Sequence, residues 1–195
     1  MFFRDLKPKS GTVSHVVLAT AHLPVKLGHR DAEKVFGTPL KAQLAAAGLG
    51  TVMSCSLRKR TSGAVQGVDL ALGLTDGREA ALRTVAGMLE ALSAPCGSSI
   101  RLVDGVGDPV LFGLTEGLEL AIDTPYAPDA DSRRDLAHAC KSALEHMGVS
   151  RGWDYSRDKT VFYFYGESYG EMRERLARVL KTTDRFSDAT IRRMA

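Results

Sequence analysis

The chain has 195 residues, of which 44% are hydrophobic and 25% charged, and its formal net charge is +3. This balance is that of an ordinary folded protein, so long disordered stretches are not expected, and the weak positive charge is far from the concentrated basic stripe of a dedicated nucleic-acid binder. The length allows one large domain or two small ones.

The sequence carries no targeting or membrane signal that we recognise. It starts with MFFRDLKPKSG, which lacks the apolar core of about 7–15 residues that a signal peptide needs, and no run approaches the roughly 18 apolar residues of a membrane span. Cys55, Cys96 and Cys140 are widely spaced and form no CxxC pair, which favours reduced thiols. We therefore expect a cytoplasmic protein with no membrane association.

The first half begins with a strand and a helix. The apolar, β-branched run at residues 13–20 predicts a buried strand. Residues 31–47 predict a helix in one piece or two, because Thr38 followed by Pro39 resembles a fresh helix start. Gly48 is a plausible stop for this helix.

Two strands, a helix and a further strand follow. Apolar and polar residues alternate at residues 52–58 and 68–74, which is typical of strands with one buried face. Asp76 and Glu79 form a capping box for the next helix. The inward stripe of that helix is Leu82, Val85, Met88, Leu89 and Leu92. Residues 98–104 complete the order βαββαβ.

The second half repeats this order, although its sequence is barely similar to the first. Alternation at residues 118–123 predicts a strand, and a helix follows from about Ser132 to Met147, with Gly148 as its stop. GWDYSR and TVFYFY predict a hairpin, a helix follows, and DATIRRM can close the sheet. An extra hairpin arm at residues 109–114 precedes this half.

Each half fits the split βαβ, or ferredoxin-like, plan of an antiparallel sheet with both helices on one face. We therefore predict an α+β protein of two tandem ferredoxin-like halves, residues 1–105 and 106–195. The joint is expected in DGVGDP, where glycine and proline cluster.

Residues 166–170 read G-x-S-x-G, the nucleophile motif of many serine hydrolases. That motif needs a mostly parallel sheet and a later histidine, whereas the element order predicts antiparallel pairing and every histidine precedes Ser168. Ser168 and Glu171 also form a capping box for the last long helix. We predict that Ser168 is a helix cap; a hydrolase that uses an earlier histidine stays an alternative, because triads are defined by geometry.

No metal or cofactor motif is found. His22 and His29 are seven residues apart, and His138 and His146 are eight apart on a predicted helix, so neither pair fits a metal signature. No glycine-rich phosphate-binding pattern is present. We predict no cofactor and no enzymatic activity.

Aromatic residues gather in the second-half hairpin, beside Arg157. They are Trp153, Tyr155, Tyr163 and Tyr165. Aromatics on a central strand can stack on RNA bases, but Glu119 and Asp123 would share the open sheet face with Tyr163, and carboxylates repel phosphates. The mixture suits a protein partner better, since Trp, Tyr and Arg are common interface anchors. If the first half covers this face, the cluster is instead a core between the halves.

Two stretches resemble bacterial families. FGTPLKAQLAAAGLGTVMSCSLR and GVDLALGLTDGREAALRTVAGMLEALSAPCGSSI resemble small proteins encoded beside polymorphic and type VI toxins. DSRRDLAHACKSALEHMG and RDKTVFYFYGESYGEMRERLARVL are similar to the ferredoxin-like regulator-of-ribonuclease-B group. Neither group is enzymatic, so the resemblance implies a protein that binds and blocks another protein.

We therefore predict a bacterial immunity protein that occludes a cognate toxin, with an RNA-binding or ribonuclease-regulating module as the alternative. The sequence leaves the oligomeric state and any small-molecule ligand open. The predicted partner-binding residues are Trp153, Tyr155, Arg157, Tyr163, Tyr165, Glu119 and Asp123.

Overall fold

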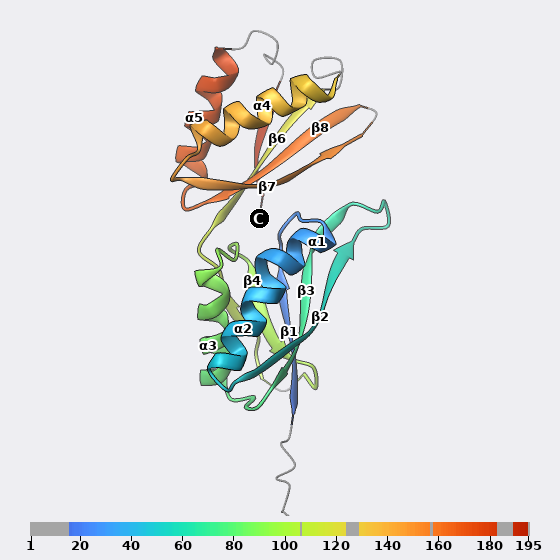
Figure 1. The fold of residues 1–195 in the computed structure, drawn as a ribbon, viewed down its shortest axis with the longest axis vertical. Helices are drawn as coiled ribbons and strands as arrows, with labels where there is room; N and C mark the ends of the chain where they lie inside the picture. Colours follow the sequence, from blue (N-terminus) through green and yellow to red (C-terminus); the bar gives the residue numbers. More distant parts are fainter. Residues whose placement is uncertain (1–15, 106, 124–128, 157, 183–188, 195) are drawn as a thin grey trace, which may run out of the picture.

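The protein is described from a computed structural model, which covers residues 16–105, 107–123, 129–156, 158–182 and 189–194. Two antiparallel sheets, one of five strands and one of four, form the framework of these residues. Helices cover one face of each sheet, and the second half sits at one end of the first (Figure 1).

The first sheet has the strand order β2-β3-β1-β4-β5, and all its neighbouring strands are antiparallel. Its strands are β1 (Val17–Leu23), β2 (Gly50–Lys59), β3 (Val65–Leu74), β4 (Ser98–Leu102) and β5 (Val110–Phe112). The helical segments of this half are α1 (His29–Ala32), the π-turn η1 (Glu33–Gly37), α2 (Thr38–Ala46) and α3 (Glu79–Ala91).

The second sheet has the strand order β7-β8-β6-β9 and is also antiparallel throughout. Its elements are β6 (Glu116–Asp123), α4 (Ala130–Ala143), β7 (Gly148–Tyr155), β8 (Lys159–Gly166), α5 (Tyr169–Lys181) and β9 (Thr190–Met194). In both sheets the second, third, first and fourth strands of the unit lie side by side, which is the ferredoxin-like arrangement. The predicted fold class is therefore confirmed.

The joint between the halves lies later than residues 105–106, where the sequence placed it. The arm predicted at 109–114 to precede the second half is instead β5, which pairs with β4 at the edge of the first sheet. Val110 and Phe112 are buried in the first core, which explains why this short segment stays with that half. The chain therefore crosses between the sheets at residues 113–115.

Hydrogen bonds attach the crossing segment to the end of α3 and to the loop after it. The backbone N–H of Gly113 donates to Glu90 (2.9 Å), and the N–H of Cys96 donates to the carbonyl of Thr115 (2.7 Å). Gly113 has a φ of 111°, and a Cβ added there would lie 1.9 Å from the carbonyl oxygen of Pro95. Only glycine allows the backbone of residue 113 to lie this close to Pro95, so the two halves are joined by a short connection that packs against the first half.

The helix between β1 and β2 is continuous from α1 to α2, so Thr38 is not a fresh start. Its N–H donates to the carbonyl of Glu33 across a π-turn, and this wider turn precedes Pro39, which has no N–H to donate. Gly48 ends the helix with a φ of 66°, as predicted.

Two other predicted helix ends differ. Asp76 accepts a hydrogen bond from the N–H of Arg78 (2.9 Å) and does not cap Glu79, because Arg78 itself occupies the N-cap position. At the end of α4 the left-handed residue is His146, with a φ of 67°, and Gly148 already belongs to β7. The predicted cap at Asp76 is two residues too early, and α4 ends at Ala143, four residues before the predicted end at Met147.

The second half builds one core of its own and contributes to another. Phe162 and Phe164 pack on the helices α4 and α5, as predicted from their alternation. The other side of β8 faces the first half, and there Tyr163 and Tyr165 belong to the same buried cluster as Val25. The open face of the second sheet is therefore covered by the first half.

Candidate functional site

The contact between the two halves, here called the seam, is built from β8, β7 and the loop after β1. Tyr165 is 1% exposed, and its hydroxyl oxygen accepts a hydrogen bond from the backbone N–H of Lys26 (2.9 Å). Tyr163 is 8% exposed and donates to the carboxylate of Asp154 on β7 (2.9 Å). Of the two alternatives for these tyrosines, the structure shows the core between the halves.

Burial at the seam changes the acid–base behaviour of both phenols. It raises the pKa of Tyr165 to about 12, and it raises the pKa of Tyr163 further, with the Asp154 carboxylate as a second cause. Both side chains are therefore neutral hydrogen-bonding groups at physiological pH. Neither is available as an exposed anchor for a partner.

At the same seam, the negative charge of Glu119 acts on the ammonium group of Lys26. The ammonium group of Lys26 donates to the carbonyl of Val65 (2.5 Å). Burial lowers the pKa of Lys26, Arg60 adds to this, and the carboxylates of Glu119 and Asp154 oppose it. Glu119 thus partly balances a half-buried cation, and a binding role for it stays a prediction.

A second cluster, here called the aromatic ridge, consists of Trp153, Tyr155 and Arg133. Trp153 and Tyr155 are 50% and 52% exposed. The guanidinium carbon of Arg133 lies 4.4 Å from the ring centroid of Tyr155 and 5.8 Å from that of Trp153. At these distances a guanidinium over an aromatic face is attracted by the ring.

The strand β7 places the ridge at a sheet edge. Trp153 lies opposite Phe162, with ring centroids 6.5 Å apart, so it faces the side of the sheet that carries α4. Within the part of the chain that the structure describes, the other side of β7 pairs with no strand. Two exposed aromatics, a cation and a strand edge therefore occur together.

The seven predicted partner-binding residues thus separate into several places. Trp153 and Tyr155 form the ridge, whereas Tyr163, Tyr165 and Glu119 lie at the seam. Asp123 is exposed at the end of β6, opposite Lys159 on β8, and Arg157 lies outside the described residues. The sequence missed Arg133, whose position at the start of α4 beside a later hairpin is set only by the tertiary fold.

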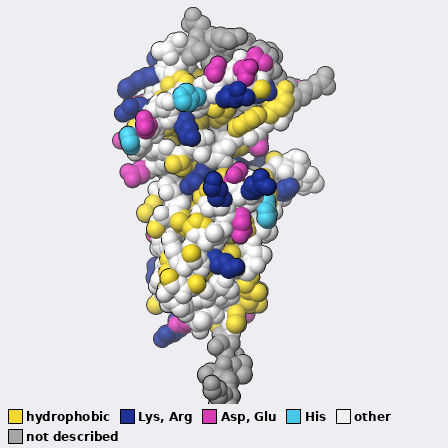
Figure 2. Space-filling model, viewed as in Figure 1, with side chains coloured by type: hydrophobic (Ala, Val, Ile, Leu, Met, Phe, Trp, Pro, Cys, Tyr) yellow, Lys and Arg dark blue, Asp and Glu magenta, His cyan; other side chains and the backbone are white. Residues whose placement is uncertain are grey.

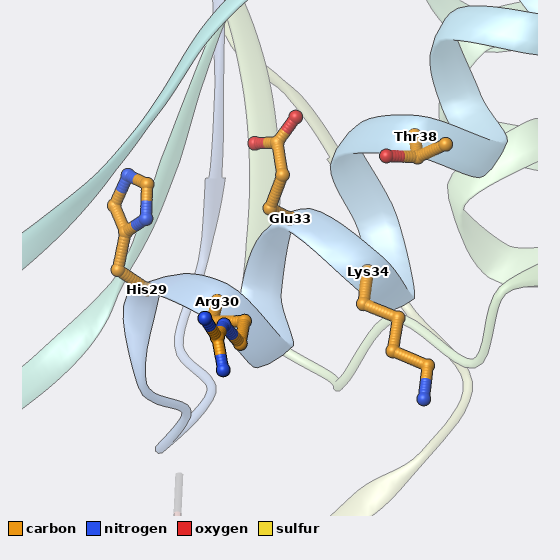
Figure 3. A pocket seen from close by; sticks show the side chains of 5 residues that line it. All are labelled: His29, Arg30, Glu33, Lys34 and Thr38. Atoms are coloured by element: carbon orange, nitrogen blue, oxygen red, sulfur yellow. The ribbon is translucent and has the colours of Figure 1, made fainter.

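A cavity of about 440 Å³ lies over α1 and η1 (Figure 3). His29, Arg30, Glu33, Lys34 and Thr38 line it, and in Figure 3 Arg30 and Lys34 point away from Glu33. His29 is held by a hydrogen bond between its Nε2 and the carbonyl of Cys55 (3.0 Å).

Glu33 and Cys55 next to this cavity do not form an activated thiol. Burial, with the charge and hydrogen bond of Glu33 as further causes, raises the pKa of Cys55 to about 11. The Cys55 thiol is therefore protonated at neutral pH, which makes it a poor nucleophile.

Ser168 occupies the N-cap of α5, as predicted. Its side-chain oxygen accepts a hydrogen bond from the N–H of Glu171 (3.3 Å), and the N–H of Tyr169 donates to Glu116 (2.6 Å). The strand before it, β8, is antiparallel to both neighbours. The parallel sheet that a nucleophile elbow requires is not found around Ser168.

The described residues contain neither a metal-ligand cluster nor a membrane-spanning helix. No group of three or more His, Cys, Asp or Glu there could hold a metal ion. Among the same residues, no helix combines the length and the apolar character needed to cross a bilayer.

Comparison with known proteins gives only remote structural likeness. No family model and no curated protein matches the sequence. The regulatory subunit of aspartate kinase from Thermus flavus is 12% identical, with 84% of this chain and 93% of that chain covered and a TM-score of 0.28. A putative monooxygenase from Fusobacterium nucleatum is 10% identical, with 93% and 92% covered and a TM-score of 0.31. The first two RRM domains of yeast poly(U) binding protein are 8% identical, with 91% and 99% covered and a TM-score of 0.24.

Proposed function

We propose that the protein acts by binding another protein, as an inhibitor of the immunity type, and that the aromatic ridge on β7 is its contact surface. The observation that carries this proposal is the exposure of Trp153 and Tyr155, half of each side chain, beside the stacked guanidinium of Arg133. Trp, Tyr and Arg are the residue types that dominate binding energy in protein interfaces.

The backbone of β7 supports the same surface. An edge strand offers unpaired N–H and C=O groups to an incoming strand, and side chains next to it select the partner. The β-bulge between Ser150 and Gly152 interrupts the pairing of β7, whereas residues 153–155 are regular and carry the ridge. A partner segment would therefore add along residues 153–155.

The proposed target is a bacterial toxin whose active site is covered by this surface. Support comes from the resemblance of residues 36–100 to proteins encoded beside polymorphic and type VI toxins. The net charge of +3 suits a neutral or acidic target surface better than a basic nuclease.

RNA binding through the open face of the second sheet is not supported. The stacking platform for bases would consist of Tyr163 and Tyr165, and both are buried at the seam. Opening that platform would require separation of the two halves and loss of the hydrogen bond to Lys26.

The experiment uses the full chain with an affinity tag, expressed in its source cell. Partners captured by the parent are compared with those of a Trp153→Ala/Tyr155→Ala variant and of a control, Leu111→Ala, which changes an exposed apolar residue on the edge strand β5. A loss of about 2 kcal/mol at one anchor weakens binding about thirtyfold, so the double variant should lose the partner and the control should keep it.

The captured protein is then purified and its own activity is measured with increasing amounts of the parent chain. Inhibition that saturates at a one-to-one ratio supports the proposal. Equal capture by the ridge variant and the control, or a partner whose activity is unchanged at saturation, would refute it.

A further inference from the structure

A cavity of about 620 Å³ lies between the C-terminal end of α4 and the start of β7. Its volume is within the range of about 300–1,000 Å³ that is usual for small-molecule sites. The lining includes His138, Lys141, Glu145, His146, Ser150 and Arg151. Neither the ridge nor the tyrosines of the seam belong to it.

The charges of this cavity are mostly of one sign. Lys141 and Arg151 are cations, and Glu145 is the one carboxylate in the lining. Figure 2 shows Lys, Arg and His side chains, interspersed with Asp and Glu, on the face of the second half that carries α4, and further Lys and Arg along its junction with the first half. The lining therefore favours an anion.

The chain brings these groups together by its helix period and by a turn. His138, Lys141 and Glu145 are three and then four residues apart, which places them on one side of α4 and its last turn. His146, in the left-handed conformation, then turns the chain back into β7. Arg151 comes from the β-bulge of β7, which lets its side chain leave the regular alternation.

Arg151 is the group that a simple structural account does not explain. Its guanidinium carbon lies 5.7 Å from the ring centroid of Phe36 in the first half, and burial lowers its pKa. None of the ion pairs among the described residues includes it. A partly desolvated cation without a carboxylate is unfavourable, and a bound anion would offset this cost.

Basic side chains at the end of a helix also interact with its carbonyl groups, and Lys141 in the last turn of α4 fits that role. Arg151 does not, because it lies on β7 and stacks on Phe36. The dipole of α4 therefore accounts for part of the cluster and leaves the guanidinium of Arg151 without a counter-charge.

We propose that this cavity binds a small phosphorylated organic molecule, with its phosphate between Arg151 and Lys141 and its organic part beside Glu145. Two permanently charged cations match the double charge of a phosphomonoester, and a guanidinium can contact two of its oxygens at once. The hydroxyls of Ser142 and Ser150 supply further donors in the lining. Glu145 accepts a hydrogen bond from a hydroxyl of the ligand, which distinguishes a phosphomonoester from free phosphate.

The test is an NMR titration of the amide signals of the full chain with inorganic phosphate, glycerol 3-phosphate and glycerol, at constant ionic strength. Saturable shifts at residues 138–151 are expected with both phosphates and not with glycerol, and glycerol 3-phosphate should bind more tightly than phosphate. Lys141→Gln and, separately, Arg151→Gln should each weaken binding about tenfold. Glu145→Gln should reduce the preference for glycerol 3-phosphate over phosphate.

Lys181→Gln is the matched control, because Lys181 occupies the last turn of α5 as Lys141 occupies the last turn of α4. It should bind as the parent does. Lys141 is exposed, so its variant keeps the test valid if Arg151→Gln disturbs the contact with Phe36. Shifts that do not saturate, or equal weakening by Lys141→Gln and Lys181→Gln, would refute the site. Tighter binding of free phosphate would refute the role of Glu145. None of these variants alters the ridge, so the result is independent of the proposed function.

Discussion

Removal of one hydroxyl at the seam, by Tyr165→Phe, is expected to destabilise the whole protein. The ring stays in place, but the backbone N–H of Lys26 loses the acceptor that lies 2.9 Å away. Sδ of Met194 also loses a weak contact with the hydroxyl at 4.0 Å. An unpaired buried N–H costs about 1–3 kcal/mol. Because Lys26 is only half-buried, we expect about 1–2 kcal/mol.

Urea unfolding followed by two signals measures this change. Trp153 is the single tryptophan, so its fluorescence reports the second half, whereas far-ultraviolet circular dichroism reports both halves. The two curves should coincide in the parent chain, because the halves share one buried cluster. In Tyr165→Phe both midpoints should fall, and the thermal midpoint should drop by about 2–4 °C for each kcal/mol lost.

Tyr155→Phe is the matched control, since it removes the same hydroxyl from a side chain that is 52% exposed. Its stability should stay within about 0.5 kcal/mol of the parent. The reasoning fails if Tyr165→Phe is as stable as this control. It also fails if the two signals of the parent unfold at different urea concentrations.

Three other changes test separate parts of the structure. Raising the pH from about 9 to about 11 should lower the free energy of unfolding, because Tyr165 and Tyr163 keep their protons when folded but lose them near pH 10 when unfolded. The share of Tyr165, whose folded pKa is about 12, is about 1 kcal/mol, so urea titrations at both pH values should show a drop smaller by this amount in Tyr165→Phe. Gly113→Ala should cost more than about 3 kcal/mol, because the new Cβ would lie 1.9 Å from the backbone of Pro95; a thermal midpoint near that of the parent would contradict this. Ser168→Ala should cost about 1 kcal/mol through loss of the α5 cap, and labelling of the parent but not the variant by a fluorophosphonate would contradict a purely capping role.

Most of the fold could be predicted because its signals are local. Alternation at residues 52–58, 68–74 and 118–123 identified strands, and element order then gave the ferredoxin-like plan of each half. The buried face was wrong at Met53, which was expected inside with Cys55 and Leu57 but is 60% exposed, because a β-bulge between Val52 and Ser54 shifts the alternation. The joint between the halves could not be placed, because β5 has three residues and is too short to show a period. Glycines on both sides of it gave the same turn signal.

The candidate sites were less accessible to sequence reasoning, because they depend on contacts between distant segments. Alternation correctly placed Tyr163 and Tyr165 on the side of β8 opposite the helices, but it carries no information on what covers that side. A hint was present in the loop after β1, where Val25 and Leu27 are apolar although they lie outside regular structure. The stack of Arg133 on Tyr155 left no such signal.

The hydrogen bond that joins the halves at Lys26 is donated by the main chain and not by the side chain. Any amino acid other than proline can supply the same donor at this position, so the identity of residue 26 can change without loss of this hydrogen bond between the halves. Related chains could therefore share this mode of assembly with no visible constraint on the loop sequence. Tyr165, which accepts this hydrogen bond, is the partner whose replacement related chains would tolerate least.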